Sequence, residues 1–168
     1  MTGVGREITV ATFEDHHLDA ALALWAATEH LGPTPPDEVA ALRAHDPGLV
    51  LVAEDDRQLV GVVLGSFDGR RGWISRLAVA DDARRRGVAR ALVVEVERRL
   101  AARGCRQVNL LTFDDNEGGR ALWTSLGYRG IDRVVLYSRA LDGDGDGDVA
   151  GAGCGDRTGD PSTRGPGC

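Results

Sequence analysis

Residues 77–89 read Leu-Ala-Val-Ala-Asp-Asp-Ala-Arg-Arg-Arg-Gly-Val-Ala, which is an apolar strand end, a short arginine-rich loop closed by glycine, and the start of a helix. The helix is predicted by an apolar stripe with three- and four-residue spacing, at Val88, Leu92, Val93, Val96 and Leu100. Gly104 is expected to end it. N–H groups in the first turn of a helix lack intrahelical partners and carry a partial positive charge, and Gly87 lets a ligand approach the backbone closely. The stretch therefore predicts a site for a phosphate-bearing ligand.

Two common phosphate-binding motifs are excluded by residues that the sequence lacks. A Walker loop requires Gly-Lys-Ser/Thr, but all 20 basic residues of this chain are arginine. A dinucleotide-binding loop requires the spacing Gly-x-Gly-x-x-Gly, which this stretch does not have. The loop must therefore belong to another class of phosphate site.

The composition changes abruptly after Leu141. Residues 142–168 open with an alternating Asp-Gly run and contain almost no large apolar side chains, so we expect a disordered, acidic Gly/Asp-rich tail after one folded domain at 1–141. The tail carries six acidic residues and two arginines, which leaves 20 acidic and 18 basic residues in the domain, a net charge of −2. A nearly neutral domain argues against nucleic acid as a partner.

The sequence carries no signal for a membrane or a metal. No apolar run approaches the roughly 18 residues of a membrane span, and Arg6 and Glu7 stand where a signal peptide would be apolar. We therefore expect a cytoplasmic protein with no membrane partner. The cysteines Cys105, Cys154 and Cys168 show neither metal-ligand spacing nor a disulfide framework, so no metal is predicted. A monomer and a homodimer are both compatible with the sequence.

The hydrophobic pattern predicts an α/β fold with a mostly antiparallel mixed sheet and about four helices. Strands are expected at residues 8–12, 49–53, 59–64, 73–79, 108–112 and 134–141. Helices are expected at residues 15–28, 35–44, 88–103 and 117–126, with Thr34 as the cap of the second. The predicted order is strand, helix, helix, three antiparallel strands, helix, strand, helix, strand.

Two motifs in this order resemble one known family. Residues 84–89, Arg-Arg-Arg-Gly-Val-Ala, fit the pattern R/Q-x-x-G-x-G/A, which resembles the coenzyme A pyrophosphate loop of the GNAT acyltransferase superfamily. Asn116, followed by Ala-Leu-Trp-Thr-Ser-Leu-Gly-Tyr at 121–128, is similar to the N-x4-A-L-Y-x2-L-G-F/Y signature of the same superfamily. The element order is also that of the GNAT fold over about residues 6–141, and small bacterial members are the most similar.

The resemblance implies that acetyl-CoA is the co-substrate and that backbone groups hold it. The strand that carries Leu77 would splay from its neighbour and pair with the pantetheine arm, and the amide of Leu77 or Ala78 would donate to the thioester oxygen as charge develops there. Amides of the loop would hold the pyrophosphate, with Arg84 or Arg86 adding charge-assisted hydrogen bonds. The expected cofactor-binding residues are Leu77, Ala78, Val79, Arg84, Arg85, Arg86, Gly87, Val88, Ala89 and Asn116. For Asn116, capping of the following helix is an equal alternative.

The resemblance also nominates an acceptor side. The superfamily builds its acceptor pocket from the first helix and its exit, and the strand turn before the cofactor strand lies close in sequence. The expected substrate-binding residues are therefore Trp25, Glu29, Asp68 and Trp73. His30, in the same helix exit, is interpreted as a surface residue.

Two positions depart from the superfamily's pattern. Trp123 stands where many relatives carry a tyrosine that protonates the leaving thiolate, and an indole N–H cannot serve in that way. Leu111 stands where some relatives carry a glutamate that helps to activate the amine.

Candidate replacement bases are Glu14, Glu29, Asp68 and Asp114, of which Asp68 ranks first. The catalytic residues are predicted to be Asp68 and, through its backbone amide, Leu77. A proton could come from Ser75, from Tyr128 or from water.

The sequence thus predicts an N-acyltransferase that moves an acetyl group from acetyl-CoA to a primary amine by direct attack in a ternary complex. The acceptor is expected to be a small molecule or a peptide. A non-catalytic module that binds or senses acyl-CoA is the alternative, because it would explain the missing tyrosine and glutamate. An arginine-rich nucleic-acid adaptor is disfavoured by the nearly neutral domain.

Overall fold

The computed structural model describes residues 8–132, 134–139 and 141. One mixed sheet has the strand order β1-β2-β3-β4-β5, with β1 (Ile8–Thr12), β2 (Val50–Asp55), β3 (Gln58–Phe67), β4 (Gly72–Val79) and β5 (Val108–Leu110). Its helices are α1 (Leu18–Ala27), α2 (Pro36–His45), α3 (Val88–Ala102) and α4 (Glu117–Ser125). The first four strands pair antiparallel, and β5 lies parallel to β4. None of the helices in these ranges is both long and apolar enough to cross a bilayer.

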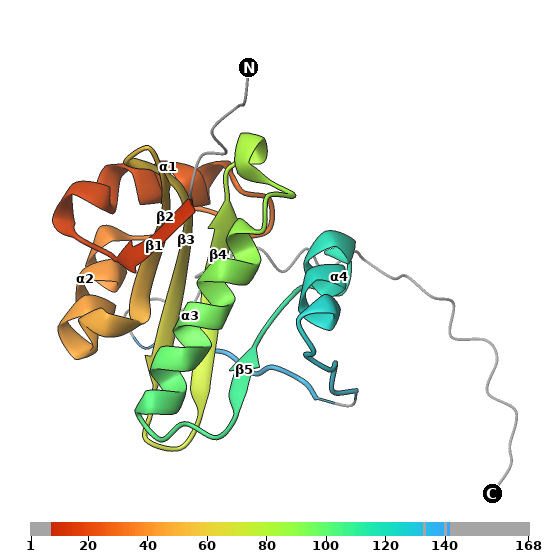
Figure 1. Ribbon diagram of the computed structural model, residues 1–168. Coiled ribbons are helices and arrows are strands. Elements are labelled where there is room, and N and C mark those ends of the chain that lie inside the picture. Colours follow the sequence, from red (N-terminus) through yellow and green to blue (C-terminus); the bar gives the residue numbers. More distant parts are fainter. Residues whose placement is uncertain (1–7, 133, 140, 142–168) are drawn as a thin grey trace, which may run out of the picture. The chain divides into compact units, whose positions relative to one another are not determined.

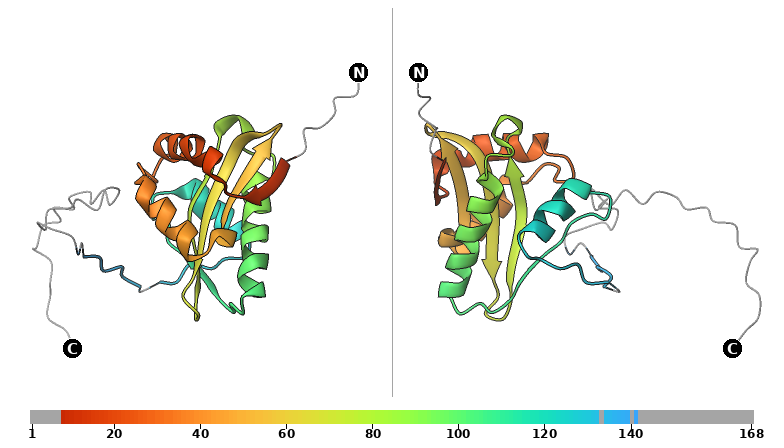
Figure 2. Two further views of the ribbon diagram at one scale, coloured as in Figure 1. Left: turned by 90° about the vertical axis from the view of Figure 1, so that its left-hand side faces the viewer. Right: turned by 45° about the vertical axis from the view of Figure 1, so that its right-hand side comes forward.

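The sheet is covered on both faces, as Figures 1 and 2 show. One face packs against α1 and α2 through a cluster that includes Trp25, Val39 and Val62. The opposite face packs against α3, whose buried stripe is the predicted set Val88, Leu92, Val93, Val96 and Leu100. Strands β2 and β3, buried on both faces, form the centre of the core.

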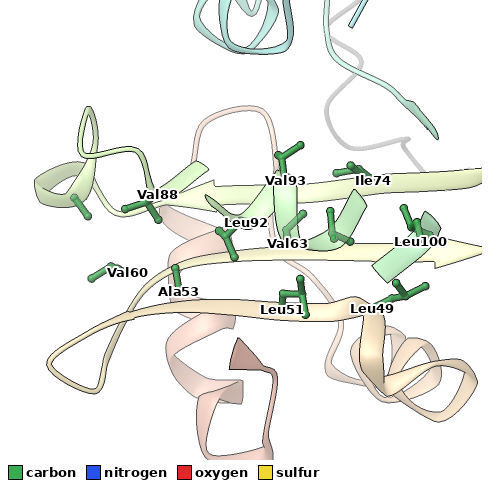
Figure 3. Close-up of a cluster of buried hydrophobic side chains, with 12 residues drawn as sticks. Leu49, Leu51, Ala53, Val60, Val63, Ile74, Val88, Leu92, Val93 and Leu100 are labelled. Carbon is green, nitrogen blue, oxygen red and sulfur yellow. The ribbon is translucent and has the colours of Figure 1, made fainter. Parts of the chain in front are cut away.

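Two glycines of β3 let α3 lie close to the sheet. A Cβ atom at Gly61 would lie 2.8 Å from Cγ1 of Val88, and one at Gly65 would lie 2.6 Å from Cγ2 of Val96. Real Cβ contacts are not that short, so only glycine fits beneath the helix at these two points. Figure 3 shows the cluster that results, with the side chains of α3 beside those of the central strands. Because Val88 is the first residue of α3, Gly61 lies beneath the point where the helix begins.

A bulge in β4 reverses which residues face α3. Val62 pairs with Ala78 and Leu64 pairs with Ser75, so the two residues Arg76 and Leu77 lie opposite Val63 alone. Before the bulge Ile74 faces α3, whereas after it Leu77 and Val79 do so and Ala78 packs with α1 and α2. An insertion of one residue exchanges the two faces of a strand, because side chains alternate with period two.

The structure confirms the predicted order of elements up to α4, with boundaries that move by a few residues. The last strand, predicted at 134–141, is wrong: residues 134–139 form no strand, and Val134, Val135 and Leu136 are each 68% exposed. Strand propensity needs a neighbouring strand edge to be realised, and β5 offers only three paired residues. Thr34 does not cap α2, whose N-cap is Pro35. The predicted tail at 142–168 lies outside the described residues.

We expect Gly61→Val to destabilise the fold by about 1–3 kcal/mol, because the new side chain would overlap Val88 and Leu92. Urea unfolding monitored by circular dichroism would measure the loss. Gly130→Val is the matched control, since a Cβ atom there has no neighbour within 4 Å. Equal stability of the two variants would contradict the close packing of α3 on β3.

Candidate functional site

A gap opens between β4 and β5. The two strands pair only through Gly72–Ile74 and Val108–Leu110, after which they diverge (Figure 1). Strand β4 continues to Val79, and no described strand lies beside this second half on the β5 side. The gap therefore exposes a backbone edge of β4. An extended ligand could form hydrogen bonds to this edge, as an additional strand would.

The bulge of β4 lies at the start of this gap and is held from the α1 side. Arg76 has a φ of +51°, a left-handed conformation that is unusual for arginine. The indole Nε1 of Trp25 donates to the carbonyl oxygen of Arg76 at 2.8 Å, and the Arg76 guanidinium donates to the carbonyl of Leu31 at 2.8 Å. These bonds tie the bulge to the helix exit that follows α1. Since Trp25 is fully buried, it presents no surface to an acceptor, which differs from the prediction made for it.

The arginine loop leads from β4 into α3 through two left-handed residues. Arg85 has a φ of +62° and Gly87 a φ of +81°, whereas the φ of Arg86 between them is not positive. Such alternation turns consecutive backbone N–H groups toward one side and forms an anion-binding nest. The nest lies directly before the first turn of α3, where further N–H groups have no intrahelical partner. No atom lies within 4 Å of a Cβ atom placed on Gly87, so the backbone here is open to a ligand.

The three arginines of the loop have different partners. Arg84 is paired with Asp81 at 2.9 Å on the surface, and Arg86 is paired with Asp55 at 2.8 Å. The Asp55 side chain is only 7% exposed, and its other oxygen has no hydrogen-bond partner among the described residues. Arg86 therefore anchors the loop to the end of β2. Of these three arginines, Arg85 is exposed and has no ion pair with another described residue, so its guanidinium is available to bind an anion.

The segment around α4 is held by its own contacts. The side chain of Asn116 accepts from the backbone N–H of Gly119 at 2.8 Å, which confirms it as the helix cap. The Trp123 ring meets the Tyr128 ring edge-on at 5.2 Å, and both pack against the core on the α3 side. Trp123 is therefore a packing residue in this fold.

The Tyr128 hydroxyl, a candidate proton donor, is already hydrogen-bonded, and its pKa is raised. Its hydroxyl donates to Oε1 of Glu97, on α3, at 2.6 Å. Burial first, and then this hydrogen bond to Glu97, raise the pKa of the Tyr128 phenol above its ordinary value. A phenol with a raised pKa gives up its proton less readily, which makes Tyr128 a weaker acid than an unperturbed tyrosine.

Asp68 lies far from the gap. It occupies the turn between β3 and β4, where its carboxylate accepts from the backbone N–H groups of Arg70 at 2.7 Å and Arg71 at 2.6 Å. The hydrogen bonds from Arg71 and Arg70 hold the pKa of Asp68 below its usual value, which makes it a weaker base. At about 3.3 Å per residue, the five steps along the strand from Gly72 to Leu77 span roughly 16 Å. The structure thus does not bring the two predicted catalytic residues together.

The other two residues predicted to bind the acceptor, Trp73 and Glu29, lie in different parts of the fold. Trp73 is partly exposed on β4, next to Asn109 of β5, so it lies beside the paired part of the two strands. Glu29 is exposed in the turn after α1, and its carboxylate lies 3.8 Å from Nε2 of His30. Leu111, one residue beyond β5, is exposed.

One cluster in the described ranges has the composition of a metal site. His16, His17 and Glu54 bring their ligand atoms within 4.8 Å of one another. However, Nδ1 of His17 accepts from the backbone N–H of Glu14 at 2.9 Å, and Nε2 lies 3.4 Å from Glu54. A neutral imidazole that accepts at Nδ1 carries its proton on Nε2 and has no lone pair left for a cation. The cluster is therefore a local brace between β2 and the turn before α1.

Comparison with known proteins agrees with this geometry. The family model described as "Acetyltransferase (GNAT) family" matches residues 13–128. An acetyltransferase of Pectobacterium atrosepticum is 34% identical over 135 residues, 79% of this chain and 96% of that protein. An acetyltransferase of Sodalis glossinidius is 34% identical over 79% of this chain and 94% of its own length.

Solved structures share the fold. Ard1 from Thermoplasma volcanium superposes with a TM-score of 0.66 at 21% identity, covering 71% of this chain and 81% of its own. The aminoglycoside N-acetyltransferase AAC(6')-Iy in complex with CoA gives a TM-score of 0.66 at 22% identity, covering 83% and 99%. The ribosomal-protein-S18-alanine N-acetyltransferase of Escherichia coli gives 0.62 at 22% identity, covering 72% and 77%.

We expect Arg86→Ala to cost more stability than Asp55→Ala. The first variant leaves a carboxylate that is 7% exposed without its counter-charge, whereas the second leaves a guanidinium that is 35% exposed and can turn to water. The expected losses are about 3 kcal/mol and about 1 kcal/mol, measured by urea unfolding. The reverse order would mean that the pair does not anchor the loop.

Proposed function

Because the chain belongs to the GNAT acetyltransferase family, we propose that it transfers the acetyl group of acetyl-CoA to a primary amine by direct attack in a ternary complex. Acetyl transfer itself follows from the family. The direct attack, the residues that hold the donor and the nature of the acceptor are the content of the proposal. Membership in an enzyme family favours turnover over the alternative of a sensing module.

A single observation carries the donor side of this proposal. The unpaired edge of β4 runs from the bulge at Arg76 to Val79, and the chain then enters the nest and the first turn of α3. An extended arm and a pyrophosphate, in this order, are the two parts of coenzyme A that a site must hold. The residues present therefore fit the co-substrate: the β4 edge suits the pantetheine amides, and the nest suits the pyrophosphate.

The side chains of the loop have distinct parts in this proposal. Backbone amides from Arg85 to Ala89 bind the pyrophosphate, and the exposed guanidinium of Arg85 neutralises its charge. Arg86 acts indirectly, because its pair with Asp55 holds the loop against β2. Asn116 is committed to its capping bond through Oδ1, and any contact with the co-substrate falls to its Nδ2 group.

The bulge provides the catalytic amide. Acetyl-CoA supplies a thioester carbonyl, and the backbone N–H of Leu77 or Ala78 donates to its oxygen as negative charge develops. Trp25 and Arg76 keep this backbone in place, so that the donor is oriented before the reaction. A leaving thiolate with a pKa of about 8.5 needs little help from an acid, which is why a tryptophan at position 123 is compatible with turnover.

The class of acceptor is an amine. Two fold neighbours are named for amine substrates, one an aminoglycoside and the other the alanine of a ribosomal protein. We propose a small molecule or a peptide amine for this chain as well. A panel with one aminoglycoside, one polyamine and one alanine-terminated peptide, read by release of free thiol from acetyl-CoA, would distinguish these classes.

Acetyl-CoA is expected to raise the melting temperature of the protein, and Gly87→Glu is expected to abolish the shift, because it places an anion in the nest. Differential scanning fluorimetry with millimolar acetyl-CoA would measure this.

Gly69→Glu is the matched control for that variant. It introduces the same charge at a glycine of similar backbone, with a φ of +86° against +81°, and neither site has an atom within 4 Å of the added Cβ. The control should keep the shift. If acetyl-CoA does not raise the melting temperature of the unmodified protein, the proposed acetyl-CoA site is wrong.

Tyr128→Phe is expected to leave kcat unchanged, because the phenol is bonded to Glu97 and does not act as the acid. The variant should lose about 1 kcal/mol of stability with the hydrogen bond. Free-thiol release and urea unfolding together would check it. A large fall in kcat would restore Tyr128 as a candidate acid.

A further inference from the structure

His30 lies between the turn that is tied to β4 and the chain that leaves β5. It is part of the turn after α1, and this turn is tied to the bulge because Arg76 donates to the carbonyl of Leu31 at 2.8 Å. On its other side the imidazole ring contacts the ring of Phe113, three residues beyond β5, with 5.6 Å between ring centroids. The ring thus stands between the strand that carries the catalytic amide and the chain that leaves β5.

The backbone of His30 has an unusual conformation. Its φ is +66°, a left-handed conformation that side-chain-bearing residues seldom adopt. Such conformations persist where surrounding contacts determine them, and they concentrate at functional sites. Here the contacts are the Arg76 bond at Leu31 and the ring of Phe113.

The side chain of His30 is partly sheltered and has charged neighbours. Its side chain is 25% exposed, so it is sheltered yet reachable. The Glu29 carboxylate lies 3.8 Å from Nε2 and is the acidic neighbour of the ring. The other charged groups near it along the chain are the Arg76 guanidinium, which is bonded to Leu31, and the acids Asp114 and Asp115, which follow Phe113.

We infer that His30 is the general base of the transfer, and this inference rests on the proposed function. The amine nitrogen forms a bond to the acetyl carbon, and the carbon–sulfur bond breaks with its electron pair leaving on sulfur. The nitrogen gives one proton to a ring nitrogen of His30, and the thiolate takes a proton from water. Glu29, predicted to bind substrate, is then the partner of the base. This assignment replaces Asp68, which lies in a remote turn and accepts two backbone hydrogen bonds.

The test uses bromoacetyl-CoA, which places an alkylating carbon where the acetyl group would lie. A ring nitrogen of His30 would displace bromide and form a stable N–CH2 bond. Mass spectrometry of arginine-specific peptides, with and without excess acetyl-CoA, identifies the residues whose labelling the natural co-substrate prevents. Protection separates labelling within the site from alkylation of thiols such as Cys105, which is partly exposed.

The expected result is protected labelling of His30. Protected labelling of another residue, or none while acetyl-CoA still raises the melting temperature, would overturn the inference. If acetyl-CoA gives no shift, the proposed function fails first, and the inference falls with it.

Turnover gives a second readout with the amine of the panel that releases most thiol. His30→Gly suits the left-handed backbone, so the fold should tolerate it. Its kcat is expected to fall on the order of 100-fold with an unchanged KM for acetyl-CoA, and added imidazole should restore part of the rate. His45→Gln, at an exposed histidine at the end of α2, should behave like the unmodified protein. An unchanged kcat in His30→Gly would overturn the inference.

Discussion

The bulge at Arg76 is the constraint on which the site depends. A left-handed arginine within a strand is costly by itself, and the structure offsets this cost with two hydrogen bonds, one from Trp25 and one to Leu31. The extra residue turns Leu77 toward α3 and re-aims the amides that follow it. The same bulge lies where β4 and β5 diverge, so the unpaired strand edge and the backbone amide that we propose to act on the thioester begin at the same point of the chain.

The nest depends on packing that begins elsewhere in the fold. Gly61 allows Val88, the first residue of α3, to approach β3, and Asp55 holds Arg86 at the end of β2. The loop between these anchors has little freedom left, and its two left-handed residues are oriented before a ligand arrives. Preorganisation of this kind reduces the ordering cost of binding. The donor side is therefore a property of the central sheet and not of the loop alone.

The acceptor side follows a different principle, because side chains rather than backbone groups must supply its chemistry. The tyrosine and glutamate that many relatives use are absent here. Trp123 packs on Tyr128, and Leu111 is exposed. The residues that we propose instead, His30 and Glu29, lie in the turn after α1, which is tied to β4 by Arg76. Arg76 both forms the bulge and holds the turn after α1. A change at the bulge would therefore affect the proposed donor site and the proposed acceptor site together.

The sequence by itself determined the order of elements up to α4, the buried stripe of α3 and the position of the arginine loop, because these depend on local periodicity and on glycine, and it offered capping as one of two roles for Asn116. Even the bulge left a local signal, since Ile74, Leu77 and Val79 are spaced three and then two residues apart. Only the tertiary structure decided that Trp25 is buried, that Arg86 is paired with Asp55, that Asp68 lies in a remote turn and that residues 134–139 form no strand. These outcomes depend on partners distant in the sequence, and neither composition nor spacing specifies which distant groups will meet.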